Sequence, residues 1–320
     1  MKSTLAILIL ALAFPFTASV AMAQQPAWAY AIAPPRPPGT PTPTRGAPDP
    51  TPRHLPGSTA EYSRAQLSDF FSSTDWYPGD HPPMPAVVAR GRKPAVRRCS
   101  MCHYPNGRGR PENAPVAGLP VAYFIQQLKD FANGDRNTSE TRKTNGAGMI
   151  TLGKAMTDEE MKQAAEYFGS IKWTPWMKVV ETNRIPKVKV QGGIWVTVEG
   201  DEKEAIGNRI IETPVNTEAA EQLFDSRSDF IVYVPVGSIK KGEALAKKAQ
   251  CASCHGSDLK GLGPVPGLAA RSPSYLARQL YDTQQGTRHG VWSDLMKPVV
   301  ANMKEEDILN LMAYTTSLAQ

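Results

Sequence analysis

A five-residue pattern, Cys-x-x-Cys-His, occurs twice in this chain and constrains its fold more than any other feature. The two copies are Cys99-Ser100-Met101-Cys102-His103 and Cys251-Ala252-Ser253-Cys254-His255. Two thiols on one helical turn can add to the two vinyl groups of a porphyrin, and the adjoining imidazole can bind its iron. We therefore expect two covalently attached haem c groups. The expected attachment residues are Cys99, Cys102, Cys251 and Cys254, and the expected proximal iron ligands are His103 and His255.

Different uses of these cysteines explain less of the pattern. The chain contains 4 cysteines, and all of them lie in the two motifs. A single zinc site is disfavoured because 149 positions separate Cys102 from Cys251, far more than zinc-ribbon spacing. Two local disulfides or a thioredoxin-like redox pair would also use paired cysteines in an oxidising compartment. Neither of these explains why histidine follows the second cysteine in both copies.

The first 23 residues have the composition of a secretory signal peptide. Lys2 precedes an apolar run over residues 5–20, and Ala21-Met22-Ala23 is a small-x-small cleavage site before Gln24. An uncleaved membrane anchor is the alternative, although the run is short for a bilayer span. We expect no transmembrane segment after cleavage. In a bacterium the mature protein would lie in the periplasm, where c-type haems are attached.

The two halves of the chain are copies of one unit. An offset of 152 residues relates Cys99 to Cys251, Tyr123 to Tyr275, Gln127 to Gln279 and Arg136 to Arg288. After this stretch an offset of 147 residues relates Met149 to Met296, Met156 to Met303 and Tyr167 to Tyr314. Duplication of one haem-binding module therefore predicts two domains of similar architecture.

Each copy has the pattern of a mainly helical unit. Residues 122–131 and 275–283 have apolar positions at helical spacing and end before Gly134 and Gly286. Thr157-Asp158-Glu159-Glu160 is a capping box that predicts a helix through residue 168. The counterpart of this last helix is expected from about residue 304 to residue 318.

Met149 and Met296 are the expected distal iron ligands. Each lies seven residues before the methionine that precedes the last helix, in a segment that we expect to be irregular. Methionine more often only fills apolar space, and Met156 and Met303 fit that role at the start of the last helix. The equal spacing in both copies favours a shared function for Met149 and Met296. The remaining histidines, expected at the surface or near a haem without binding iron, are His54, His81 and His289.

Composition divides the chain into five segments. Ten prolines lie between residues 34 and 56, which predicts a disordered tether. Val188 and Val190, then Ile194, Val196 and Val198, occupy alternate positions on the two sides of Gly192-Gly193, which predicts a β-hairpin. The segments are a signal peptide (1–23), a tether (24–59), a first haem domain (60–173), a β-rich insert (174–235) and a second haem domain (236–320). The insert would be a structural spacer or a docking surface.

The repeat resembles the diheme class I cytochromes c, of the kind called cytochrome c4. The resemblance rests on the two motifs, on Pro266-Gly267-Leu268-Ala269-Ala270, on residues 275–288, and on the methionines followed by an acidic helix. It implies a mainly α fold, with two cytochrome c-type haem domains joined here by a small β-containing insert. It also implies His/Met ligation, and a Pro266 carbonyl that orients His255. In the first copy Ala114 stands at the equivalent position.

These features favour an electron carrier over an enzyme. An iron held by His and Met has no open site for a substrate, and this ligand pair raises its reduction potential. We expect a periplasmic carrier between a respiratory or dehydrogenase donor and an oxidase-type acceptor. The competing functions are a cytochrome subunit of a dehydrogenase complex and a diheme peroxidase, which would need an open iron. A net charge of +6 without a Lys/Arg block favours an acidic redox partner over nucleic acid.

Overall fold

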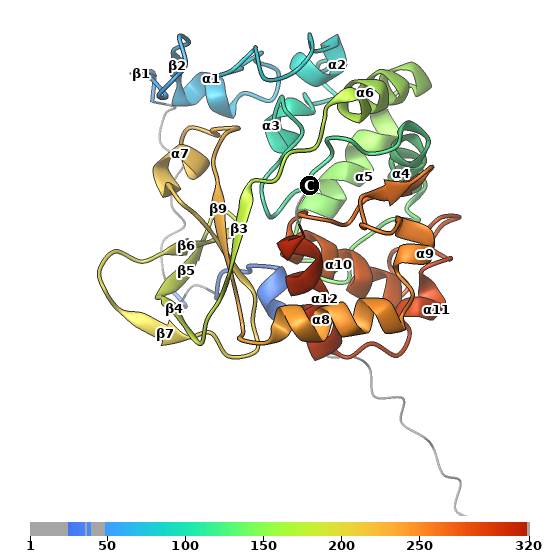
Figure 1. Cartoon of the computed structure of the whole chain (residues 1–320). Coiled ribbons are helices and arrows are strands. Elements are labelled where there is room, and N and C mark those ends of the chain that lie inside the picture. The colour runs from blue at the N-terminus through green and yellow to red at the C-terminus, as the bar shows by residue number, and fades with distance from the viewer. Residues whose placement is uncertain (1–24, 36, 40–48, 319–320) are drawn as a thin grey trace, which may run out of the picture.

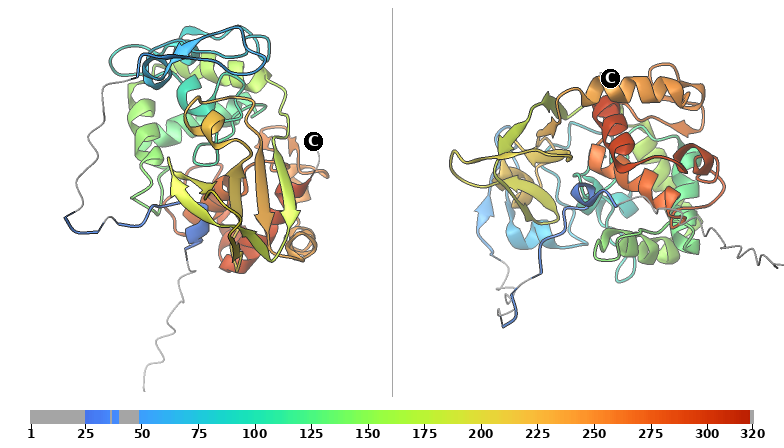
Figure 2. Two further views of the ribbon diagram at one scale, coloured as in Figure 1. Left: turned by 90° about the vertical axis from the view of Figure 1, so that its left-hand side faces the viewer. Right: turned by 90° about the horizontal axis from the view of Figure 1, so that it is seen from below.

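Two groups of helices lie one above the other, and a layer of strands lies beside both of them (Figure 1). The computed structural model describes residues 25–35, 37–39 and 49–318. Two further views show the strands as a separate layer at the side of the helices (Figure 2). The predicted signal peptide lies outside the described residues. None of the described helices is both long enough and apolar enough to cross a bilayer.

The first group of helices, called the first module here, contains the first Cys-x-x-Cys-His motif. Its helices are α2 (Ala86–Ala89), α3 (Ser100–His103), α4 (Val121–Asn133), α5 (Asn145–Ala155) and α6 (Asp158–Ser170). Helix α4 ends at Gly134 as predicted, because its φ of 87° is left-handed and suits glycine. Helix α6 begins at the predicted capping box. Phe124 of α4 stacks on Phe168 of α6 with ring centroids 6.0 Å apart, which joins the two helices in one core.

Helix α5 corrects our expectation for the segment around residue 149. We expected this segment to be irregular, but Met149 lies inside the helix. Gly146 and Gly148 lower its helix propensity and no side chain caps its start, so the sequence signal is weak. Packing compensates for this weakness. A Cβ at Gly153 would lie 2.9 Å from the backbone nitrogen of Ala132, so glycine allows α5 to approach α4 closely.

The second module repeats this arrangement around the second motif. Its elements are α8 (Ser238–Lys248), α9 (Ala252–His255), β10 (Gly261–Leu262), β11 (Val265–Pro266), α10 (Pro273–Gln284), α11 (Lys297–Val300) and α12 (Glu305–Ser317). Helices α10 and α12 occupy the predicted segments. A Cβ at Gly242 would clash with the carbonyl of Asn310, so glycine permits the close packing of α8 on α12. Met296 is the N-cap of α11, a single turn.

The strands beside the modules come from the segment between them, called the insert here. They are β3 (Met177–Glu181), β4 (Arg184–Pro186), β5 (Val188–Gln191), β6 (Ile194–Thr197), β7 (Lys203–Ala205), β8 (Ile211–Pro214) and β9 (Phe230–Val234), with α7 (Thr217–Glu221) before the last. The predicted hairpin is confirmed, since β5 and β6 pair antiparallel across Gly192-Gly193. The first and last strands, β3 and β9, pair in parallel. Because the pairing is parallel, the chain leaves the first module at one end of the strand pair, before Met177, and enters the second module at the other end, after Val234.

Part of the segment that we expected to be a disordered tether is packed against the rest of the chain. It contains the short helix η1 (Ala27–Ala29), and Trp28 and Tyr30 are only 3% and 1% exposed. The carbonyl of Trp28 accepts a hydrogen bond from Trp195 Nε1 in the insert at 3.0 Å. The carbonyl of Ala29 accepts one from Arg278 of α10 at 2.6 Å. The proline content indicated disorder, but the burial of two aromatic side chains favours packing at this end of the segment.

The residues before α2 cover the far end of the first module (Figure 1). They include β1 (Pro52–Arg53), β2 (Tyr62–Ser63) and α1 (Arg64–Ser68). Leu67 and Trp76 are buried in a small apolar cluster of this segment. Arg98, one residue before the first motif, donates to the carbonyl of Leu67 at 3.2 Å. The segment therefore packs directly beside the haem-binding motif.

The N-terminal packing predicts a stability effect for Trp28→Ala. The substitution removes a fully buried aromatic side chain, so the free energy of unfolding should fall by about 3–5 kcal/mol. Denaturant unfolding followed by tryptophan fluorescence and circular dichroism measures this change. Val215→Ala is the control, because Val215 is 66% exposed and its truncation should change little. Equal unfolding midpoints for Trp28→Ala and the unmodified protein would show that the segment does not stabilise the fold.

Candidate haem sites

Each motif places its two thiols and its imidazole on one turn of helix. Cys99 precedes α3, and the backbone N–H groups of Cys102 and His103 both donate to its carbonyl, at 3.3 and 3.0 Å. Helix α9 repeats this arrangement around the carbonyl of Cys251 with the same two distances. Before a haem is attached, burial raises the pKa of the Cys99 thiol to about 12. Among the described residues, no three His, Cys, Asp or Glu side chains gather as a metal site.

A backbone carbonyl orients the imidazole of each motif. His103 Nδ1 lies 2.8 Å from the carbonyl oxygen of Ala114, and His255 Nδ1 lies 2.8 Å from that of Pro266. A carbonyl only accepts, so Nδ1 carries the proton and the lone pair of Nε2 is left to bind a metal. Burial lowers the pKa of both histidines, which favours the neutral form that ligates iron. Pro266 therefore has the predicted role, and the Ala114 carbonyl replaces it in the first module.

A cavity of about 330 Å³ lies beside His103. Its apolar wall comes from α4 and α5 and includes Phe124, Leu128 and Leu152. The polar residues that line it, called its polar end here, include Gln127, Arg136, Asn137, Lys143 and Asn145. A haem has an apolar ring and two charged propionates, so a lining with both apolar and polar residues suits it. Cys99, Cys102 and His103 line the same cavity and would hold the group there.

Two methionines of α5 and its C-terminal end line this cavity. Met149 and Met156 are seven residues apart, about two helical turns, and so lie on one face of the segment. Both side chains also pack against the core of this module. Met149 as the distal ligand stays our proposal, and Met156 is the competing side chain. In the second module Met296 is partly buried before α11, and Met303 packs against the core of that module.

The wall of the first cavity is completed by the second module. Tyr275, Arg278, Gln279 and Asp282 of α10 all line it. Arg136 donates to Tyr275 Oη at 3.0 Å and to Gln279 Oε1 at 2.7 Å. Tyr275 and Gln279 are the repeat counterparts of Tyr123 and Gln127. The repeat itself gave no signal that Arg136 of one copy meets Tyr275 and Gln279 of the other.

Arg288 makes the reciprocal contacts in the opposite direction. It donates to Tyr123 Oη and to Gln127 Oε1, both at 2.9 Å. A backbone bridge pairs Arg136 with Arg288. The two modules are thus joined by a pseudo-twofold interface built from repeated residues, at the polar end of the first cavity.

The remaining histidines lie in three different environments. His54 is 63% exposed and lies 3.3 Å from Glu61. His289 is 52% exposed and lies 3.7 Å from Asp135. The side chain of His81 is only 4% exposed, so of the two expected places, at the surface or near a haem, it does not occupy the first. The surrounding prolines concealed its burial, because proline-rich loops usually face solvent.

The ligand proposal predicts the effect of Met149→His and Met296→His. Replacing a thioether by an imidazole should lower the reduction potential of one haem in each variant, because Met/His ligation raises the potential. Both haems should stay attached, since the cysteines are unchanged. Spectroelectrochemical titration measures the two potentials, and Met156→Leu is the matched control at the end of the same helix. If Met149→His leaves both potentials unchanged while Met156→Leu removes the low-spin spectrum, Met156 is the ligand.

Known proteins share sequence with both modules. The sequence model of the cytochrome c family matches residues 88–172 and 239–319. The thiosulfate dehydrogenase electron acceptor of Stutzerimonas stutzeri is 23% identical over 233 residues, which cover 72% of this chain and 83% of that protein. Cytochrome c4 of Pseudomonas aeruginosa is 23% identical over 224 residues, covering 69% and 83% of the two chains. A solved cytochrome c4 structure from Acidithiobacillus ferrooxidans is 22% identical, covers 69% of this chain and 98% of its own, and has a TM-score of 0.44.

The family model matches more than half of the chain, in two copies that each contain one Cys-x-x-Cys-His motif. This match, the oriented histidines and the cavity beside His103 agree with one another. The chain therefore belongs to the cytochrome c family and carries two covalently attached haem c groups.

Proposed function

We propose that this diheme electron carrier works in the periplasm and passes single electrons from a dehydrogenase or respiratory donor to an oxidase-type acceptor. Its irons would be held by His103 with Met149 and by His255 with Met296. When bound, such haems supply a one-electron couple with little rearrangement. The protein supplies the orientation of each imidazole and an apolar wall that excludes water from the ring.

The observation that carries this proposal is the shared wall of the first cavity. Tyr275 and Gln279 of the second module line the cavity of the first, and Arg136 bonds to both of them. The interface thus joins the polar end of one haem site directly to the other module. We infer that an electron accepted at one haem passes through this interface to the other, so the two modules act as one conduit.

The relatives support a dehydrogenase as the donor. One relative, in Stutzerimonas stutzeri, is named as the electron acceptor of a thiosulfate dehydrogenase. That name also favours the second candidate function, a cytochrome subunit held in a dehydrogenase complex. The two candidates differ in whether the protein purifies alone or with a catalytic chain.

An optical and redox titration tests the carrier function. The protein, expressed with haem-attachment machinery, should contain two haems per chain and show the far-red sulfur-to-iron band of ferric His/Met haem. It should have positive potentials and should not react with carbon monoxide or peroxide, because neither iron would have an open site. A haem that lacks the band, binds carbon monoxide and turns over peroxide would contradict the carrier and favour the peroxidase.

The proposed electron transfer through the interface between the modules predicts the effect of Arg136→Gln. Loss of two charge-assisted hydrogen bonds, each worth roughly 1.5–3 kcal/mol, should loosen the contact between modules. Electron exchange between the haems, measured by flash photolysis of a bound photoreductant, should slow while both haems stay attached. Arg209→Gln is the control, because Arg209 pairs with Glu204 inside the insert. An unchanged exchange rate in Arg136→Gln would mean that each haem exchanges electrons independently of this interface.

A further inference from the structure

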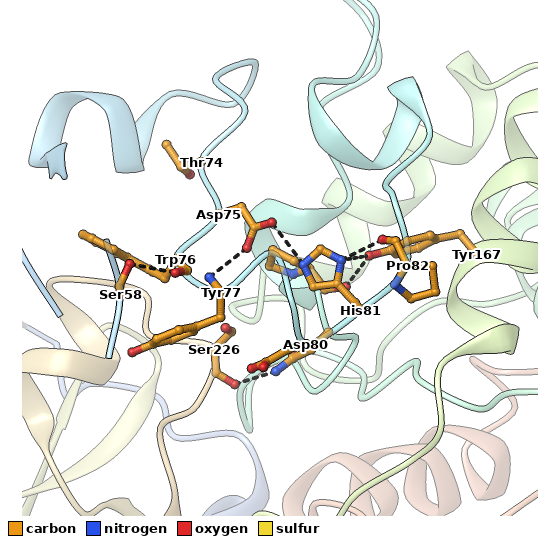
Figure 3. Close-up of polar contacts among 12 residues, drawn as sticks. Ser58, Thr74, Asp75, Trp76, Tyr77, Asp80, His81, Pro82, Tyr167 and Ser226 are labelled. Atoms are coloured by element: carbon orange, nitrogen blue, oxygen red, sulfur yellow. Dashed lines mark hydrogen bonds and ion pairs between the residues drawn. The ribbon is translucent and has the colours of Figure 1, made fainter. Parts of the chain in front are cut away.

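A buried histidine joins the segment before α2 to the first module. Figure 3 shows His81 between Asp75 on one side and Tyr167 and Pro82 on the other. His81 Nε2 lies 3.1 Å from Asp75 Oδ2. His81 Nδ1 lies 2.8 Å from the carbonyl oxygen of Pro82 and 2.9 Å from Tyr167 Oη. The side chains of His81 and Asp75 are only 4% and 12% exposed.

The partners of His81 fix its protonation. The hydroxyl of Tyr167 donates to the carbonyl of Pro105 at 2.7 Å, so its oxygen is left to accept. Nδ1 therefore faces only acceptors, and Nε2 faces a carboxylate. A neutral imidazole has only one N–H and would leave one of these contacts repulsive. The contacts together favour the doubly protonated imidazolium.

The other carboxylate that acts on His81 has a cationic partner of its own. Asp80, on the same segment, is paired with Arg227 at 2.7 Å, which leaves Asp75 as the carboxylate of His81. From α6 the facing titratable group is Tyr167, whose pKa is raised by burial and which stays neutral. Burial lowers the pKa of His81, but the contacts with Asp75 and Pro82 outweigh burial and raise it above its ordinary value. The His81–Asp75 pair is therefore neutral when His81 is protonated and carries one buried negative charge when it is not.

Two sets of contacts connect this pair to the first haem-binding motif. Tyr167 packs edge-on against Phe168 at 5.0 Å, and Phe168 packs edge-on against His103 at 6.4 Å between ring centroids. A cavity of about 20 Å³, enough for one water molecule, is lined by Asp75 together with Ser100 and Tyr104 of the motif segment. Tyr167 and Phe168 are only 6% and 0% exposed, so the first set of contacts runs through the protein interior, where a charge is weakly screened.

We propose that His81 is a positioning residue that couples the reduction potential of the first haem to pH through the charge of the His81–Asp75 pair. Loss of the His81 proton to solvent leaves a net negative charge near the iron. That charge favours the ferric state, which holds one more positive charge than the ferrous state, and so lowers the potential. By linkage, transfer of an electron from this iron to the external acceptor weakens proton binding at His81 by the same free energy.

The second module provides an internal control. Tyr314 is the repeat counterpart of Tyr167, but no histidine among the described residues pairs with it. The second haem site therefore has no counterpart of the His81–Asp75 pair. Its reduction potential should not follow the titration of His81. This inference depends on the two haems, and it does not depend on which donor or acceptor the protein uses.

The test is a spectroelectrochemical titration of both haems between about pH 5.5 and pH 9. In the unmodified protein the potential of one haem should fall as the pH rises above about 6.5, the ordinary pKa of histidine. A tenfold weakening of proton binding on oxidation corresponds to a fall of ~59 mV. In His81→Gln this haem should keep, at every pH, the low potential that the unmodified protein reaches at high pH, and it should lose the His81-dependent step. His54→Gln, which removes the exposed His–Glu61 contact, should leave both haems as they were.

A second readout keeps the inference testable if His81→Gln folds poorly. The imidazole carbon-bound protons of His81 report its titration by NMR in the unmodified protein, in the ferrous and the ferric states. The apparent pKa should be lower in the ferric state. Equal pKa values in the two states, or equal pH dependence of both haems in the unmodified protein, would overturn the proposal. A carrier with two His/Met haems would still stand in that case.

Discussion

The docking of the two modules depends on Arg136, because a buried guanidinium must find hydrogen-bond acceptors. Arg136 is 7% exposed, and it finds two of these acceptors only across the interface, on Tyr275 and Gln279. Separation of the modules would leave a partly buried cation without these partners and would open the polar end of the first cavity. The same contacts that join the two modules therefore also line the first haem site, and they lie on the electron route that we propose.

The insert and the N-terminal residues reinforce this docking from outside. The parallel pairing of β3 with β9 fixes the strand that leaves the first module to the strand that enters the second. Glu221 of the insert contacts Arg110 of the first module at 2.6 Å, and the buried Glu212 accepts from Ser272 of the second module at 2.7 Å. An insert with partners in both modules stabilises their relative position. The contacts of the insert with both modules explain why it is much longer than a simple linker.

Local features of the sequence predicted much of the fold, and long-range contacts account for what was missed. The motif turns, the end of α4 at Gly134, the capping box of α6 and the β5–β6 hairpin each depend on a few neighbouring residues, so the sequence determines them. Met149 was placed in an irregular segment because α5 owes its stability to contact with α4 through Gly153 and not to its own propensity. The meeting of Arg136 with the second module, the burial of His81 and the packing of Trp28 join residues far apart in the chain. A single sequence contains no signal for such contacts.

The packing of the N-terminal residues has a consequence for the order of assembly. Trp28 and Tyr30 lie against the insert and α10, which are made much later in synthesis, since Tyr30 contacts Asp282 at 3.3 Å. Trp28 and Tyr30 therefore have no binding site until most of the chain has followed them. The place where they are buried is created by segments that are made much later. A product truncated before α10 would leave this apolar segment exposed to recognition by proteases.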